Sequence, residues 1–225
     1  MKYEIQGSPF PAVMCTVGDG ASVRCQKGAM AWMTPNMEMS TKGGGIGKMF
    51  GKMVTGESLF ENIYTARGGE GMIAFTTGVP GAIIPFELSG GNCIIAQKSS
   101  FLACDNDVQM EVSFQKKLGA GFFGGEGFIM QKFTGNGTVL LEADGSVIEY
   151  TLAPGQVMIC GTGALCAMES TVQMDIESVK GLGNMLAGGE GFFNTKLTGP
   201  GKIWLQTMPV SELAGAIAPY IPSKG

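Results

Sequence analysis

An internal repeat is the feature that most constrains the fold of this chain. Residues 88–137 match residues 152–201 at a constant spacing of 64, without a gap. A more diverged copy lies at the amino end, where a spacing of 135 places Cys25 on Cys160. Repeats of this length usually stack into a continuous core. The sequence therefore predicts three tandem units within one compact whole: 1–80, 81–145, and 146–225 with its tail.

Within each unit the pattern is that of short strands. Residues 147–152 alternate apolar and polar side chains, as a half-buried strand does, and so do 108–114 and 172–177. Glycines cluster between these runs, where hairpins need positive φ. The sequence predicts an all-β fold of three β-sandwich or double-stranded β-helix-like repeats about a pseudo-threefold axis. One short helix is expected at 211–218, with Ser211 as its N-cap and Pro219 as its stop.

Composition narrows the classes of function. The chain has no histidine, which removes histidine-based catalytic triads and histidine-based zinc sites. Its net charge of −4 disfavours binding to nucleic acid, which calls for a basic face. The six cysteines form no C-x-x-C motif, so we expect buried free thiols. We expect a protein that is not an enzyme and needs no cofactor.

The amino-terminal residues lack the apolar stretch of a secretory signal. No apolar run reaches the ~18 residues of a membrane-spanning helix. The sequence thus predicts a cytoplasmic protein and leaves peripheral attachment to a membrane open.

Several motifs then occur in a specific order: YEIQG, GAMAWM, GGGIGKMFGK, GESLFENIYTARGGEG and SFLAC. Together they resemble the altered-inheritance-of-mitochondria family over nearly the whole chain. The resemblance implies three β-repeats, each like a subunit of the ring-shaped tryptophan RNA-binding attenuation protein. It also implies that a homotrimer of the three-repeat chain would form a comparable ring. It supplies no catalytic residues.

Three glutamates, Glu57, Glu126 and Glu190, occupy one repeated position. Converging on an axis, they could bind a hard cation such as Ca²⁺ or Mg²⁺. The favoured interpretation is that each accepts backbone N–H bonds at a glycine turn, because a structural need recurs in every unit. We therefore expect no metal site.

The Gly-rich loops of the three units carry large apolar residues, although exposed loop tips are normally polar. We expect these loops to be covered by the chain itself, by a second subunit or by a membrane surface. The residues are Ile46, Met49, Phe50, Met53, Phe122, Phe123, Met185 and Leu186.

Two other patterns favour ordinary explanations. The G-x-G-x-x-G match at 119–124 has no helical pattern after it, so we interpret it as a chance match. The repeated Lys132 and Lys196 are expected to be solvated strand residues rather than RNA contacts.

The leading hypothesis is a non-enzymatic scaffold or interaction protein that forms a homo-oligomeric ring, with a trimer favoured. A peripheral membrane protein that uses the apolar loops is one alternative. A small-ligand or cation binder between the repeats is another.

Overall fold

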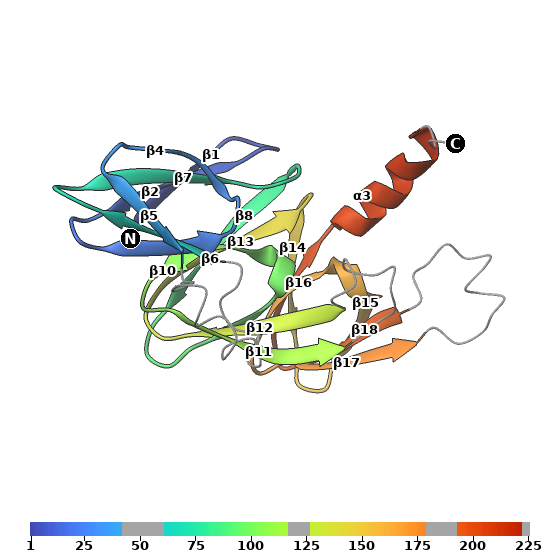
Figure 1. Ribbon diagram of the computed structural model, residues 1–225. Helices are drawn as coiled ribbons and strands as arrows, with labels where there is room; N and C mark the ends of the chain where they lie inside the picture. Colours follow the sequence, from blue (N-terminus) through green and yellow to red (C-terminus); the bar gives the residue numbers. More distant parts are fainter. Residues whose placement is uncertain (42–60, 117–126, 179–192, 222–225) are drawn as a thin grey trace, which may run out of the picture.

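The computed structural model describes residues 1–41, 61–116, 127–178 and 193–221. Figure 1 shows an antiparallel β protein with one short helix near its carboxyl end. The described strands form four sheets. The first has the order β1 (Lys2–Gln6), β2 (Ala12–Val17), β7 (Gly71–Thr76), β4 (Met30–Met33). The fourth has the order β15 (Val157–Gly161), β18 (Phe193–Thr198), β17 (Gln173–Ser178).

The two central sheets have six strands each. The second sheet runs β5 (Met37–Thr41), β6 (Glu61–Ala66), β3 (Ser22–Gln26), β10 (Phe101–Asp105), β13 (Gly137–Asp144), β8 (Gly81–Leu88). The third runs β11 (Gln109–Lys116), β12 (Phe128–Thr134), β9 (Ile94–Gln97), β16 (Leu165–Glu169), β19 (Gly201–Gln206), β14 (Val147–Leu152).

Strand pairing recurs along the chain. We name six strand positions a to f in chain order, so that a–f is β2–β7 in the first segment, β8–β13 in the second and β14–β19 in the third. In each segment a and c pair with f, and b and d pair with e. The c–f pair has a register shift in all three segments, which marks a bulge at one repeated place. The pseudo-threefold axis stays a prediction.

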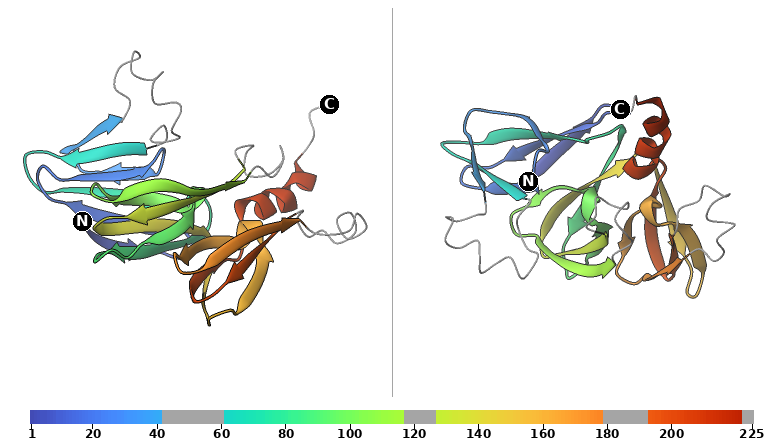
Figure 2. Two further views of the ribbon diagram at one scale, coloured as in Figure 1. Left: turned by 90° about the horizontal axis from the view of Figure 1, so that it is seen from below. Right: turned by 45° about the vertical axis from the view of Figure 1, so that its right-hand side comes forward.

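Consecutive segments are joined by a second kind of pairing. Strand b of one segment pairs with strand c of the next, as β3 with β10 and β9 with β16. Each central sheet therefore takes three strands from each of two segments, and the sheets cross the segment borders (Figure 2).

The apolar cores follow the same plan. Leu102 and Leu140 of the second segment pack in the core of the first, and Phe128 and Met130 of the second pack in the core of the third. All four are fully buried. Burial of this apolar surface therefore helps to hold neighbouring segments together.

Several sequence predictions are confirmed and one is wrong in detail. The strands expected at 147–152 and 172–177 are β14 and, one residue on, β17. The carboxyl-terminal helix is present as α3 (Val210–Ile217), but Ser211 is not its N-cap. Asp144 Oδ2 accepts from the Val210 N–H at 2.8 Å instead. The 3-10 helix η4 (Ala218–Tyr220) contains Pro219, so this proline does not simply stop the helix.

Candidate functional site

The strand pair between consecutive segments is the same at both junctions inside the chain. Cys25 faces Ala103 at the first junction, and Ala96 faces Ala167 at the second. Cys25 and Ala96 occupy one repeat position, and the two alanines that face them occupy another. All four side chains are fully buried. A junction is therefore a strand pair closed to solvent.

Polar side chains also connect the first and second segments next to this strand pair. With its side-chain amide oriented so that the nitrogen faces the acceptors, Gln26 donates to the Phe101 carbonyl oxygen (2.7 Å) and to Glu142 Oε1 (3.1 Å). Glu142 Oε2 accepts from the Gly78 N–H at 3.2 Å. Burial raises the pKa of Glu142 to about 7, because the Gly78 bond only partly offsets lost hydration and Asp144 adds like charge.

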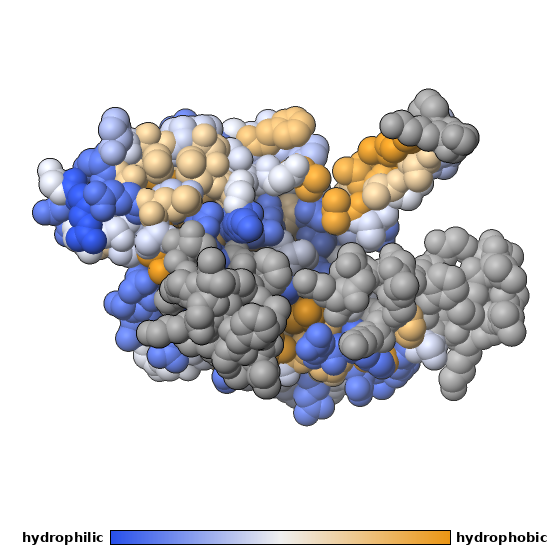
Figure 3. All heavy atoms as spheres, in the orientation of Figure 1, coloured by the Kyte–Doolittle hydropathy of each residue, from blue (hydrophilic) through white to orange (hydrophobic). Residues whose placement is uncertain are grey.

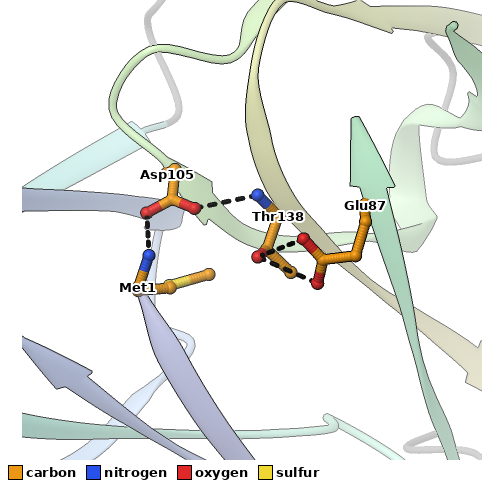
Figure 4. A network of polar contacts seen from close by, with 4 residues as sticks. All are labelled: Met1, Glu87, Asp105 and Thr138. Atoms are coloured by element: carbon orange, nitrogen blue, oxygen red, sulfur yellow. Dashed lines mark hydrogen bonds and ion pairs between the residues drawn. The ribbon is translucent and has the colours of Figure 1, made fainter. Parts of the chain in front are cut away.

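A second polar network ties the amino terminus to the second segment (Figure 4). Asp105 accepts from the Met1 ammonium at 2.7 Å and from the Thr138 N–H at 2.8 Å. The Thr138 hydroxyl lies 3.1 Å from both carboxylate oxygens of Glu87, to which it donates. The ammonium end of the chain is buried and Asp105 is mostly buried, so the ion pair is poorly screened.

The acceptor role of Asp105 recurs in the other segments. Glu169 accepts from the Lys202 N–H at 2.9 Å, and the Thr34 hydroxyl accepts from the Met72 N–H at 3.0 Å. An acceptor at the end of each c strand thus satisfies one backbone N–H at the start of each f strand. A structural need explains these repeated polar residues.

Two strands occupy junction positions without a described strand across from them. β4 is the c strand of the first segment and lies at one end of the first sheet. β15 is the b strand of the third segment and lies at one end of the fourth sheet. Figures 1 and 2 place these two strands at opposite ends of the molecule. The chain therefore presents one half of a junction at each end.

Side chains on these two strands are apolar and exposed. Trp32 on β4 occupies the repeat position of Ala103 and Ala167; it is 47% exposed, while both alanines are fully buried. Ile159 on β15 is 60% exposed, although its counterparts Arg24 and Ile95 are buried and half-buried. Apolar side chains that would be buried at an internal junction thus face solvent at both ends.

Charge distinguishes these two edges from the other sheet edges. β4 has the sequence MAWM and β15 has VMICG, with no charged residue. The remaining edge strands of the described sheets, β1, β5, β8, β11, β14 and β17, each carry at least one carboxylate. Charged side chains protect an open edge from pairing with another chain. Only the two junction-type edges lack that protection within the described part of the chain.

Most of the site residues proposed from the sequence lie outside the described residues. They are Glu57, Glu126 and Glu190, together with Ile46, Met49, Phe50, Met53, Phe122, Phe123, Met185 and Leu186. Their roles stay predictions, as does the interpretation of 119–124. Lys132 and Lys196 are described, and each lies on an exposed or half-exposed surface beside a carboxylate, Glu111 at 3.8 Å and Glu177 at 3.9 Å.

The sequence reasoning missed the two open edges, although a signal was present. The repeat alignment matches Trp32 with Ala103 and Ala167. A large aromatic side chain at a position that is otherwise alanine implies that its surroundings differ from those in the other two segments.

The described residues include all six cysteines and most of the carboxylates of the chain. All six cysteines are free, and burial raises the pKa of Cys15, Cys25, Cys104 and Cys166 to about 12. At neutral pH these thiols stay protonated and are poor nucleophiles. In ranges 1–41, 61–116, 127–178 and 193–221, no cluster of three or more Cys, Asp or Glu side chains could hold a metal ion.

None of the described helices is long and apolar enough to cross a membrane.

Comparison with known proteins gives consistent results. A family model described as "Mitochondrial biogenesis AIM24" matches residues 3–208. An uncharacterised protein of Streptococcus pyogenes serotype M6 is 32% identical over 233 residues, which covers 99% of this chain and 92% of that protein. The crystal structure of a Streptococcus pyogenes protein is similar with a TM-score of 0.83 at 28% identity, over 98% of this chain and 99% of that one.

Replacing Glu142 by glutamine should stabilise the protein at alkaline pH. The folded-state pKa of about 7 lies above the ordinary glutamate pKa of 4.5, so the stability of the native protein falls as the pH rises from about 4.5 through 7. Glutamine, which the third segment already has at the equivalent Gln206, removes the charge and keeps one of the two acceptor oxygens. We expect a gain of about 2 kcal/mol in the free energy of unfolding at pH 8 and none at pH 4.5. Urea denaturation at both pH values measures this free energy. An equal change at the two pH values would contradict the raised pKa of Glu142. The same gain in the control variant Glu111→Gln, at an exposed carboxylate, would contradict it too.

Replacing Asp105 by asparagine should weaken the join between the first two segments. The variant loses the buried ion pair with the Met1 ammonium and one of two acceptor oxygens. We expect a loss of about 1–2 kcal/mol in the free energy of unfolding at pH 7. Glu38→Gln, on the exposed pair with Arg67, should cost under about 0.5 kcal/mol. Equal losses in the two variants would show that the buried network adds nothing.

Proposed function

Because the chain belongs to the AIM24 family of mitochondrial biogenesis proteins, we propose that it is a non-enzymatic scaffold whose chains join head to tail into a closed ring of three. The open edges β4 and β15 carry this proposal, because they are the two halves of the pairing that joins segments inside the chain. In the ring, β15 of one chain pairs with β4 of the next, antiparallel.

The internal junctions also give the register of the proposed pair. Moving the two observed registers along the repeat places Trp32 opposite Cys160 and Met33 opposite Ile159. Pairing in this register satisfies the edge N–H and C=O groups and covers the exposed Trp32 and Ile159.

The geometry of the contact favours a higher assembly over an isolated dimer. The two edges differ, so each chain offers one of each, and an interface of this heterologous kind closes into a ring or continues as a filament. Three chains correspond to the ring that the family resemblance implies, with a mass near 70 kDa against 23.5 kDa for one chain.

The raised pKa values of Cys15 and Cys104 make these two buried thiols poor nucleophiles, in keeping with a role other than thiol catalysis. A scaffold calls for defined surfaces at fixed spacing, which a ring of repeated β segments provides. The proposal therefore assigns the function to the assembly rather than to a reaction.

Native mass by light scattering on a gel-filtration column tests this function. A mass of three chains, stable on dilution, is the expected result. A monomer that sediments with vesicles at high salt would contradict the ring and favour the peripheral membrane alternative. A monomer that leaves vesicles unbound would contradict both.

Variants at the two edges test the register. Ile159→Glu or Met33→Lys should each place a charge against an apolar edge and weaken each contact by about 2 kcal/mol, roughly thirtyfold in dissociation constant. The double variant should regain part of the loss because the two charges face each other. Val112→Glu, at an exposed site on β11, is the matched control and should leave the native mass unchanged. Trimers that persist in both single variants would exclude this strand pair.

A further inference from the structure

The proposed strand pair is too small to hold a ring alone. β4 and β15 have four and five residues, while stable interfaces bury about 1,200 Å² or more. A further contact surface is needed next to these edges, and α3 offers one. It has no buried residue, and Val210 and Ile217 are each about half exposed. Figure 3 shows apolar side chains along one flank of this helix, which projects from the body of the protein.

The base of α3 is fixed beside the turn that follows β15. Pro209 packs against Gly163, where an added Cβ would lie 3.2 Å from the proline Cβ. Gly163 belongs to the 3-10 helix η3 (Thr162–Ala164), which directly follows β15. The Val210 N–H is held by Asp144, so the first turn of the helix is anchored to the second segment.

The path of the chain between segments shows where α3 points. After each f strand the chain crosses to the a strand of the next segment, and consecutive crossings are hydrogen bonded. Gly81 N–H donates to the Pro9 carbonyl at 2.7 Å, and Gly145 N–H donates to the Pro80 carbonyl at 2.9 Å. At the crossing that follows the third segment, the Met208 N–H donates to the Asp144 carbonyl at 3.1 Å. α3 therefore begins where the chain would enter a fourth segment.

In the head-to-tail ring, the first segment of the next chain takes the place of a fourth segment. Its own crossing is the turn at residues 7–11, between β1 and β2, and this turn presents Phe10, which is 68% exposed. Phe10 occupies the repeat position of Gly81 and Gly145, the residues that touch the preceding crossing inside the chain. The turn of the next chain and α3 thus converge on one place.

We infer that α3 is a clamp between chains, whose apolar flank packs on the turn around Phe10 of a second copy. The inference rests on the proposed ring and names a contact that the strand pair does not supply. Packing there covers apolar side chains of both chains and adds to the small area of the strand pair.

Charged substitutions on the two sides of this contact test the clamp. Phe10→Asp and Ile217→Lys should each raise the dissociation constant of the oligomer by about tenfold or more, measured by light scattering on dilution. The double variant should lose little more affinity than the weaker of the two single variants, because both side chains belong to one contact and their effects do not add. Met39→Lys, at an exposed methionine on β5, is the matched control and should change nothing.

The outcomes separate the clamp from the ring. Wild-type trimers that dissociate in Ile159→Glu but not in Ile217→Lys would keep the ring and overturn the clamp. Losses in the two single variants that add in full in the double variant would also overturn the contact between α3 and Phe10. A wild-type monomer would refute the ring first. An unchanged mass in Ile217→Lys, with lost binding to phosphatidylglycerol vesicles, would overturn the clamp and assign α3 to a membrane surface.

Discussion

Backbone pairing between the b strand of one segment and the c strand of the next is the interaction on which the rest of the structure depends. It builds both six-stranded sheets and brings the cores of neighbouring segments into contact. A repeated junction of this kind always leaves one half unused at each end of a linear chain. The absence of charge on β4 and β15 supports the proposal that these two ends pair with other copies of the chain.

The side chains around the junction differ in charge and polarity from one segment to the next, while the strand pairing stays the same. Arg24 of β3 is buried and donates to the Val108 carbonyl, while its counterpart Ile159 on β15 is exposed and apolar. Glu142 adds a buried carboxyl to the first junction, where the second has Gln206. A contact between chains has to form from separate molecules, so apolar edges suit it better than buried charge, which is costly to desolvate.

The sequence predicted the fold well because strands and turns leave local signals. Residues 147–152 alternate apolar and polar side chains and form β14 over the same span. The N-cap of α3 was wrong because Asp144, 66 residues away in the chain, caps it from another strand. The open edges were missed for a similar reason, because whether a strand has a neighbour depends on distant segments. Only the alignment of the repeats, which matches Trp32 with Ala103 and Ala167, gives a signal for it. The apolar loop residues proposed from the sequence stay predictions.

Amide hydrogen exchange on the wild-type oligomer tests the central claim most directly. If β15 pairs with β4 of the next chain, amides on both strands should exchange as slowly as those of β3, β9, β10 and β16, which pair inside the chain. Ile159→Glu should make both strands exchange fast. Wild-type amides on β4 and β15 that exchange as fast as those on the outer edges β5 and β11 would contradict the account.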